Sequence, residues 1–267
     1  MNFNRIAGIM LRQFYLYRGS SVRVVPLFAW VTVDIVLWGF ITKYLNAIAS
    51  SGFNFVPALL GAVLLWDFFI RVMQGVTTAF FEDVWSRNFL NFFATPLSIS
   101  EYIAGLVLSA IATSSVGLVV MLVLAGLVFG LSFLVYGVLL IPFLVALFLF
   151  GIALGIFACG LVLRFGPASE WLIWPIPAIL SPFVAVFYPL STLPDWMRLI
   201  SRALPASYVF EGMRTVVSGR VLPGTMLAAS NLLAVAYILV ASWFFMRIYH
   251  QAVRTGLIAR YSAESIS

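Results

Sequence analysis

Residues 102–163 read YIAGLVLSAIATSSVGLVVMLVLAGLVFGLSFLVYGVLLIPFLVALFLFGIALGIFACGLVL, a stretch that contains no charged residue. A helix needs about 20 apolar residues to cross the hydrocarbon core of a bilayer, so this stretch is long enough for two crossings. Turn-forming residues between Gly130 and Ser132 mark the break between them. The stretch therefore predicts two membrane-spanning helices joined by a turn.

The composition of the whole chain is that of an integral membrane protein. It is 63% hydrophobic and 9% charged, with a mean hydropathy of +1.10, whereas soluble domains carry roughly 25% charged residues. No stretch of ordinary polarity is longer than about 30 residues, so we expect one all-α membrane domain, residues 24–267, preceded by residues 1–23. The net charge of +6 comes from arginines at span ends, where they meet lipid headgroups, and does not indicate nucleic-acid binding.

Four further spans flank the uncharged stretch. We expect them at about residues 24–45, 55–78, 171–190 and 225–246, each near the length that a crossing needs. The span at 171–190 contains four prolines. Proline interrupts the hydrogen bonding of a helix, so this span should be bent or broken. With the two crossings above, the pattern predicts six transmembrane helices.

The first 23 residues predict a helix that lies in the membrane interface. They carry four arginines and no apolar core of about 7–15 residues, so they are not a cleavable signal peptide. At about 100° per residue, one narrow stripe holds Ile6, Met10, Phe14 and Tyr17. Arg5 and Arg12 point the opposite way. An interfacial helix has this pattern, and so does a surface helix docked on a partner of the chain.

Six crossings place both ends of the chain on one side, and the basic residues identify that side. Nine arginines would lie on the side of the termini, against five basic residues on the other. Basic residues are enriched in cytoplasmic segments, so we expect both termini in the cytoplasm. The outer five are Lys43, Arg198, Arg202, Arg214 and Arg220. Four of them follow the fifth span, which indicates a folded segment there.

A charged segment broken by turns, residues 80–101, separates the second and third spans. It reads FFEDVWSRNFLNFFATPLSISE. A short helix, residues 86–95, would start at Ser86 and end before Pro96. Its single apolar face consists of Phe89, Leu90, Phe92 and Phe93. Either a partner protein contacts this helix, or the helix lies on the lipid headgroups.

Three charged residues fall near the middle of the first two spans. Asp34 lies near the centre of the first and Asp67 near the centre of the second, with Arg71 one turn after Asp67. Charges at this depth are costly, so the three should face the bundle interior and pair. They form either an ion pair that fixes how the two spans pack, or a polar element on a translocation path.

Residues 194–219 are too interrupted for a span and too apolar for a solvated loop. They predict two short helices on the outer side, which can dip partly into the membrane. On the first, one face carries Trp196, Leu199, Ile200 and Ala203, and another carries Arg198 and Arg202. On the second, Glu211 and Arg214 are three residues apart and can pair.

The sequence lacks the motifs of an ATP-hydrolysing subunit and of a serine protease. A phosphate-binding loop needs a lysine after glycine, yet the single lysine, Lys43, follows Thr42. No GxSxG motif accompanies a histidine inside a span. A zinc site within one chain is excluded, because zinc needs three or four ligands and the chain has one cysteine, Cys159, and one histidine, His250.

Two functional classes, an intramembrane aspartyl protease and a channel, make specific demands on the spans. An aspartyl protease mechanism through Asp34 and Asp67 stays formally open, although Arg71 favours ionisation of Asp67 and works against a proton shared by the two carboxylates. A channel would show a polar stripe along a helix, and spans three to six show none.

Two stretches resemble the membrane subunits of ABC exporters of the type-2 permease class. They are NFFATPLSISEYIAG, residues 91–105, and SPFVAVFYPLSTLPDWMRLISRALPASYVFEGMRTV, residues 181–216. The resemblance implies a permease that forms a homodimer and is driven by separate ATP-binding subunits. It also implies that these subunits bind ATP and Mg, and that this chain needs no cofactor of its own. It also implies a docking helix at residues 87–94, with Arg87 in it and Glu82 and Asp83 at its start.

The resemblance further implies export across the bacterial inner membrane. The family commonly has a basic residue and a glycine after the acidic residue of the docking segment, whereas Val84 and Trp85 follow Asp83 here. The uncharged walls of spans three to five fit an amphiphilic, lipid-like or drug-like substrate. Export of a lipid-linked polysaccharide is the alternative, although a long sugar chain would need more exposed aromatic and polar groups.

Overall fold

The computed structural model describes residues 1–48, 56–86, 89–166 and 169–257. Every regular element within these ranges is a helix, which confirms the all-α prediction. Five helical segments are long and apolar enough to cross a membrane. They are α2 (Ser21–Ile48), η1 with α3 (Val56–Leu60 and Gly61–Trp85), α5 (Ile99–Phe129), η2 with α6 (Phe133–Leu139 and Leu140–Phe165) and α11 (Gly224–Arg254).

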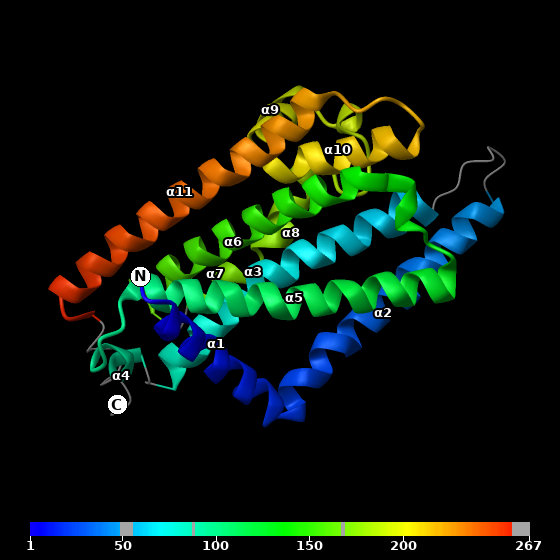
Figure 1. Ribbon diagram of the computed structural model, residues 1–267. Helices are drawn as coiled ribbons and strands as arrows, with labels where there is room; N and C mark the ends of the chain where they lie inside the picture. The colour runs from blue at the N-terminus through cyan, green and yellow to red at the C-terminus, as the bar shows by residue number, and fades with distance from the viewer. Residues whose placement is uncertain (49–55, 87–88, 167–168, 258–267) are drawn as a thin grey trace.

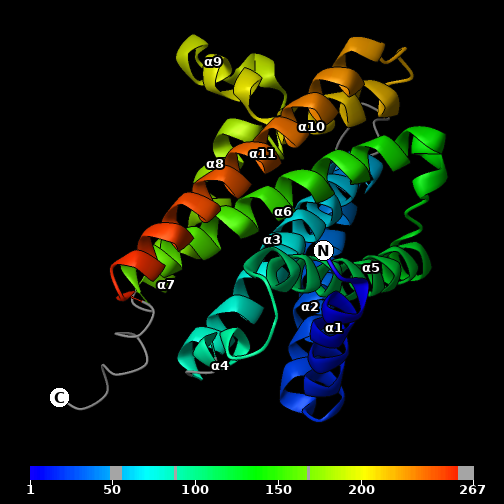
Figure 2. The same ribbon diagram turned by 60° about the vertical axis from the view of Figure 1, so that its left-hand side comes forward.

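The fifth predicted span, residues 171–190, is not a continuous span-length helix. It consists of α7 (Glu170–Ile173) and α8 (Ile176–Val184), which are separated by a turn at Trp174 and Pro175. Proline has no N–H to donate, and its ring crowds the preceding turn of a helix. The segment is therefore broken into two short helices, and not merely bent. In Figures 1 and 2, α7 and α8 follow one another along α6 and lead to α9 (Asp195–Ala203) at the opposite end of the bundle.

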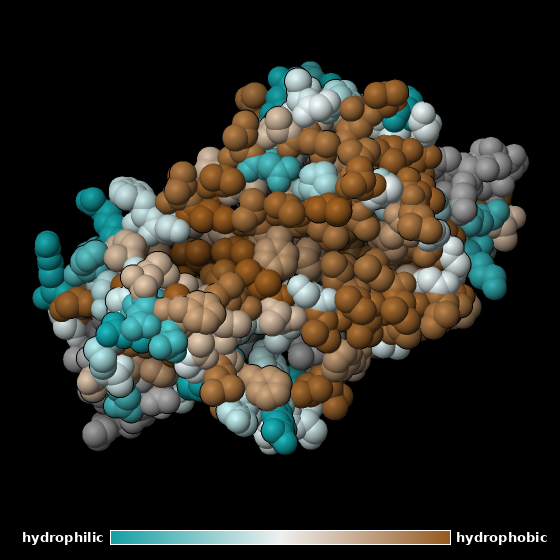
Figure 3. All heavy atoms as spheres, viewed as in Figure 1, coloured by the Kyte–Doolittle hydropathy of each residue, from teal (hydrophilic) through white to brown (hydrophobic). Residues whose placement is uncertain are grey.

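The two ends of the bundle differ in what they carry. The N-terminus, α1 (Phe3–Arg18), α4 (Phe89–Phe93) and the last turns of α11 lie at one end (Figure 1). The other end holds α9 and the start of α11 (Figure 2). Hydrophobic residues cover most of the face in between, and hydrophilic residues gather mainly at the two ends (Figure 3). This distribution is that of a bundle with an apolar belt.

The centre of the bundle is α6, which packs on α3 on one side and on α11 on the other. Two glycines one turn apart, Gly151 and Gly155, face α3, where an added Cβ would meet Val72 and Val76 at 3.0 and 2.9 Å. Small residues at this spacing let membrane helices approach closely. The tight contact between α3 and α6 therefore depends on these two glycines.

The uncharged stretch turns where the sequence predicts. Gly130 ends α5 in the left-handed conformation, with φ of 67°, which glycine adopts without a steric penalty. After the turn, the Tyr136 hydroxyl donates a hydrogen bond of 2.5 Å to the carbonyl of Pro57, at the start of the second span. The contact joins the two spans at the end of the bundle that carries α9.

Helix α1 packs on α5, and the buried face differs from the predicted stripe. The buried residues are Ile6, Ile9 and Gln13, whereas Phe14 is exposed. An added Cβ on Gly105 of α5 would lie 2.6 Å from Ile9, so the two helices touch where α5 has no side chain. The predicted apolar stripe and the buried face share Ile6 but then diverge around the helix. The periodicity of a helix does not reveal which of its sides a neighbouring helix covers.

Candidate functional site

The connection between α3 and α5, residues 80–101, begins later than the sequence suggests. Helix α3 continues to Trp85, beyond the predicted end at residue 78, so Glu82 and Asp83 lie in its last turn. The backbone N–H of Ser86 bonds to the carbonyl of Glu82 at 2.9 Å, which makes Ser86 the end of α3 and not the start of the short helix. That short helix, α4, has five residues, Phe89–Phe93. Arg87 and the side chains of Leu90 and Phe93 lie outside the described part of the chain.

Phe89 and Phe92 pack on the chain's own core. Phe89 is 5% exposed, with its ring 5.3 Å from that of Phe80 and 5.8 Å from that of Tyr102. The Phe92 ring lies 5.3 Å from that of Tyr102, and the Arg12 guanidinium lies 5.0 Å from its centre. This differs from the expectation that the apolar face of α4 is kept for a partner. The exposed residues of the connection include Trp85, Asn91, Ala94 and Thr95.

Asp83 is the centre of a buried polar network at this end of the bundle. Its side chain is 1% exposed. Both terminal nitrogens of Arg12 donate to its two carboxylate oxygens, and the Tyr102 hydroxyl donates a third bond of 2.6 Å. Charge-assisted bidentate bonds are among the strongest in proteins, so α1, α3 and α5 are joined at one carboxylate.

Two more acidic residues of the connection are held by basic residues from the start of the chain. Glu101 accepts from the Arg5 guanidinium at 3.4 Å and from the backbone N–H of Asn2 at 2.6 Å. It also bonds to the backbone N–H of Ser98 at 3.0 Å, which completes a capping box at the start of α5. Glu82 pairs with Arg23 of α2 at 2.5 Å.

These three ion pairs are not predicted from the sequence. The helical pattern of residues 1–23 places Arg5 and Arg12 on the side away from the apolar stripe, and only the resemblance gives Glu82 and Asp83 a role. The sequence does show three acidic residues in the connection, Glu82, Asp83 and Glu101, and four arginines before residue 24 that could pair with them. Their spacing alone does not assign the partners.

Of the three charged residues expected at mid-depth, Asp67 and Arg71 are in direct contact. Asp67 accepts a hydrogen bond of 2.7 Å from Arg71 one turn along α3, and both side chains are largely buried. Asp34 of α2 interacts electrostatically with both. The three residues therefore form one cluster between α2 and α3.

The segment before α11 forms two short helices, α9 and α10 (Pro205–Val217). Glu211 and Arg214 are ion-paired at 3.1 Å. Glu211 also accepts from the backbone N–H of Leu190, and Arg214 donates to the carbonyl of Val186, at 3.3 and 3.2 Å. The pair thus fixes α10 to the chain that follows α8.

Helix α9 exposes its apolar face. Its exposed residues include Trp196, Leu199, Ile200 and Arg202, and Arg198 pairs with Asp195. On the inner side, Ser201 is fully buried and donates to the carbonyl of Phe183. An exposed apolar face on a short helix at the end of an apolar belt fits an interfacial position.

The chain matches the model of a known protein family. The family model described as "ABC-2 type transporter" matches residues 9–217, a range that runs from the second turn of α1 to the end of α10. The matched range therefore includes the α3–α5 connection, the mid-depth cluster and both short helices before α11. No curated protein matches the chain.

Proposed function

Since the chain belongs to the ABC-2 type transporter family, we propose that it is the membrane-spanning subunit of an ATP-driven exporter. Membrane subunits of this family generally work with a separate ATP-binding subunit, and we assign ATP and Mg to that partner. Two copies of the chain would form the membrane part of the exporter, with one ATP-binding subunit docked on each. We propose that the broken segment α7–α8 provides the sixth crossing, which places both termini in the cytoplasm.

The observation that carries this proposal is the attachment of the α3–α5 connection. Asp83 and Glu101 tie it to α1, and Phe89 anchors it against Phe80 and Tyr102. A segment held in this way moves together with the ends of α3 and α5. A partner that pushes on its outer surface would therefore displace two spans at once, as ATP-driven transport requires.

The surface for docking is the outer side of the connection. Because Phe89 is covered by the chain itself, the partner would contact Trp85, Asn91 and Ala94, together with Arg87. The proposed site also keeps Phe92, Leu90 and Phe93, because the docking helix predicted from the sequence includes them. Aromatic and arginine residues supply most of the binding energy at such interfaces, which favours Trp85 and Arg87 as the main contacts.

The docking proposal is tested with Ala94→Arg. Ala94 is exposed and has no side-chain interaction to lose, so the variant folds normally while its bulk and charge block the interface. We expect the ATP-binding subunit to be lost from co-purification. The matched control is Thr255→Arg, which adds the same side chain at an exposed position after α11 and should retain the subunit. Full binding and coupled ATP hydrolysis by Ala94→Arg would show that the short helix lies on lipid headgroups instead.

The proposed orientation is tested by labelling single cysteines with an impermeant reagent. Cysteines at Ser98 and Arg254 should react only from the cytoplasmic side, and one at Asp195 only from outside. The native Cys159 is fully buried, so its background should be low. Reaction of the Ser98 cysteine from outside would overturn the orientation.

A further inference from the structure

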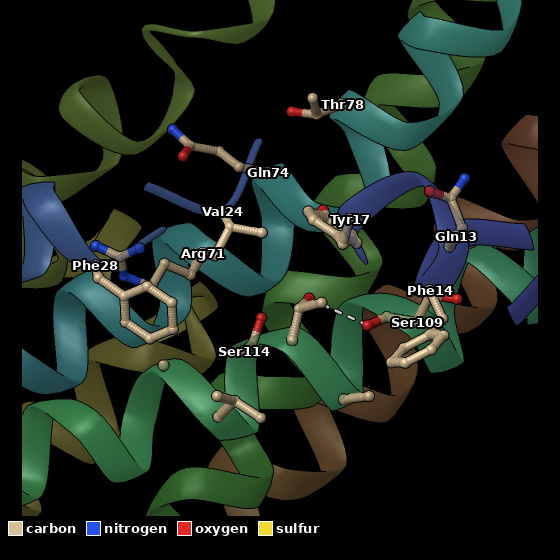
Figure 4. A pocket seen from close by; sticks show the side chains of 15 residues that line it. Gln13, Phe14, Tyr17, Val24, Phe28, Arg71, Gln74, Thr78, Ser109 and Ser114 are labelled. Atoms are coloured by element: carbon tan, nitrogen blue, oxygen red, sulfur yellow. Dashed lines mark hydrogen bonds between the residues drawn. The ribbon is translucent and has the colours of Figure 1, made fainter. Parts of the chain in front are cut away.

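A cavity of about 390 Å³ lies between α1, α2, α3 and α5 (Figure 4). Its apolar wall includes Phe14 and Tyr17 of α1 and Val24 and Phe28 of α2. Its polar groups are mostly uncharged: Gln13, Gln74, Thr78, Ser109, Thr113 and Ser114. Binding sites for small molecules typically have volumes of about 300–1,000 Å³ and combine an apolar lining with a few placed polar groups.

Gln13 is the residue that points to a ligand. It is 3% exposed, and its Nε2 is the buried side-chain nitrogen that lacks a hydrogen-bond partner among the described residues. A buried amide without a partner is unfavourable, because it has lost water and gained nothing in return. Gln13 lines the cavity, and its Nε2 is closed off from the cavity in this side-chain conformation, so a rotation of the side chain would bring this donor to a bound acceptor.

The other polar groups define the chemistry of that ligand. The hydroxyls of Ser109 and Thr113 already donate to backbone carbonyls of α5, at 2.8 and 3.1 Å, and so offer lone pairs to the cavity. Together with the Gln13 amide, the cavity presents both donors and acceptors, which suits hydroxyl groups. Arg71 lines the cavity, but Asp67 balances its charge. Burial raises the pKa of the Tyr17 phenol, which stays neutral. The site thus offers little to a charged head group.

The position of the cavity identifies where the ligand comes from. Its lining includes residues of α1 and of the first span, and the lining residue Phe14 is exposed on the surface. Ser109 and Thr113 lie in the half of α5 nearer its start, the end that also carries α4 and the termini. An amphiphile in the cytoplasmic leaflet can therefore place its head group in the cavity and leave its chain in the lipid.

We propose that this cavity binds the head group of an uncharged, hydroxyl-bearing amphiphile taken from the cytoplasmic leaflet. This proposal rests on the proposed function in one respect: the cavity faces the cytoplasmic leaflet only if both termini are cytoplasmic. Two sources share this chemistry: the cargo of the exporter, and a resident glycolipid of the membrane.

The probe for this site is an alkyl glucoside that carries a photoactivatable diazirine on its chain. The complex of the chain with its ATP-binding subunit is placed in phosphatidylcholine nanodiscs and irradiated with the probe. We expect saturable labelling of peptides from α1, α3 and α5 around the cavity. An alkyl sulfate with the same chain and diazirine should label these peptides less.

Gln13→Leu removes the unpaired amide and keeps the volume of the side chain. We expect it to raise the half-saturating probe concentration on the order of fivefold, the effect of one lost uncharged hydrogen bond. Gln251→Leu, the same change at an exposed position on α11, should label like the unchanged protein. Ala112→Phe, which fills the cavity from α5, should abolish the labelling even if Gln13→Leu affects packing.

Two results would overturn the proposal: labelling that neither Gln13→Leu nor Ala112→Phe reduces, or stronger labelling by the alkyl sulfate. Stimulation of ATP hydrolysis by the glucoside identifies the ligand as cargo, and saturable labelling without stimulation identifies a resident lipid. Retention of the ATP-binding subunit by Ala94→Arg would count against the docking proposal, whereas labelling of the cavity peptides in the unchanged complex reports on the cavity alone. The two proposals therefore fail separately.

Discussion

Replacing Asp83 by asparagine tests whether the buried network holds α1 on the bundle. The asparagine has nearly the same shape and can still accept from the Tyr102 hydroxyl. It cannot balance the charge of Arg12, whose two terminal nitrogens bond to the carboxylate in the native protein. The change therefore isolates the charge of the pair from its packing.

The magnitude follows from how deeply each partner is buried. Breaking a buried ion pair by removing one partner costs about 3–5 kcal/mol, because the other charge is left without compensation. The Asp83 side chain is 1% exposed, but that of Arg12 is 27% exposed and can regain part of its hydration. We therefore expect Asp83→Asn to lower the free energy of unfolding by about 2–3 kcal/mol.

Unfolding of the purified protein by SDS titration, followed by circular dichroism, measures this quantity. A double-mutant cycle with Arg12→Gln should give a coupling energy of about 2 kcal/mol, since residues in one network are not additive. Arg18→Gln is the control on the same helix: Arg18 is exposed, and no ion pair of it is found within the described residues. A loss below about 0.5 kcal/mol for Asp83→Asn, or additive single changes, would refute the reasoning.

Two further predictions concern the middle of the bundle. Asp67→Asn should destabilise the protein by several kcal/mol because Arg71 loses its partner at low dielectric, and adding Arg71→Gln should recover much of the loss in the same SDS titration. A double variant that is stable and assembled but does not transport would favour the translocation-path interpretation over the structural one. Gly155→Ala should cost about 1–3 kcal/mol, since its Cβ would lie 2.9 Å from Val76. Gly8→Ala, where the added Cβ meets nothing within 4 Å, is its control, and equal stability of both variants would show that α3 and α6 can move apart at little cost.

Composition and local signals predicted most of the fold. Long uncharged runs identify spans because the bilayer core excludes charge. Gly130 identifies the turn after α5, because a left-handed residue there is a local property of the chain. The pairs Asp67–Arg71 and Glu211–Arg214 are likewise one turn apart on a single helix, so their spacing is sufficient to predict them.

Contacts between distant segments could not be predicted in the same way. Arg12 and Asp83 are 71 residues apart, and nothing in the periodicity of either helix identifies the other as its partner. The sequence shows that α4 has apolar residues. It does not show whether a partner or Tyr102 of the same chain covers Phe89. The break in the span at 171–190 was predicted from its prolines, yet not how short the remaining helix would be.

The way α1 is attached has a mechanical consequence for the first span. Helix α1 is fastened to α3 and α5 through Asp83 and Glu101, whereas α2 is the least buried of the spans and begins directly after Gly19 and Ser20. A hinge at these two residues would let α2 swing sideways while α1 stays in place. Such a motion changes the space between α1 and α2, and it breaks the partly exposed pair of Arg23 with Glu82 together with the packing of α2 on α5. The first span would thus move relative to α1, which stays fixed on α3 and α5.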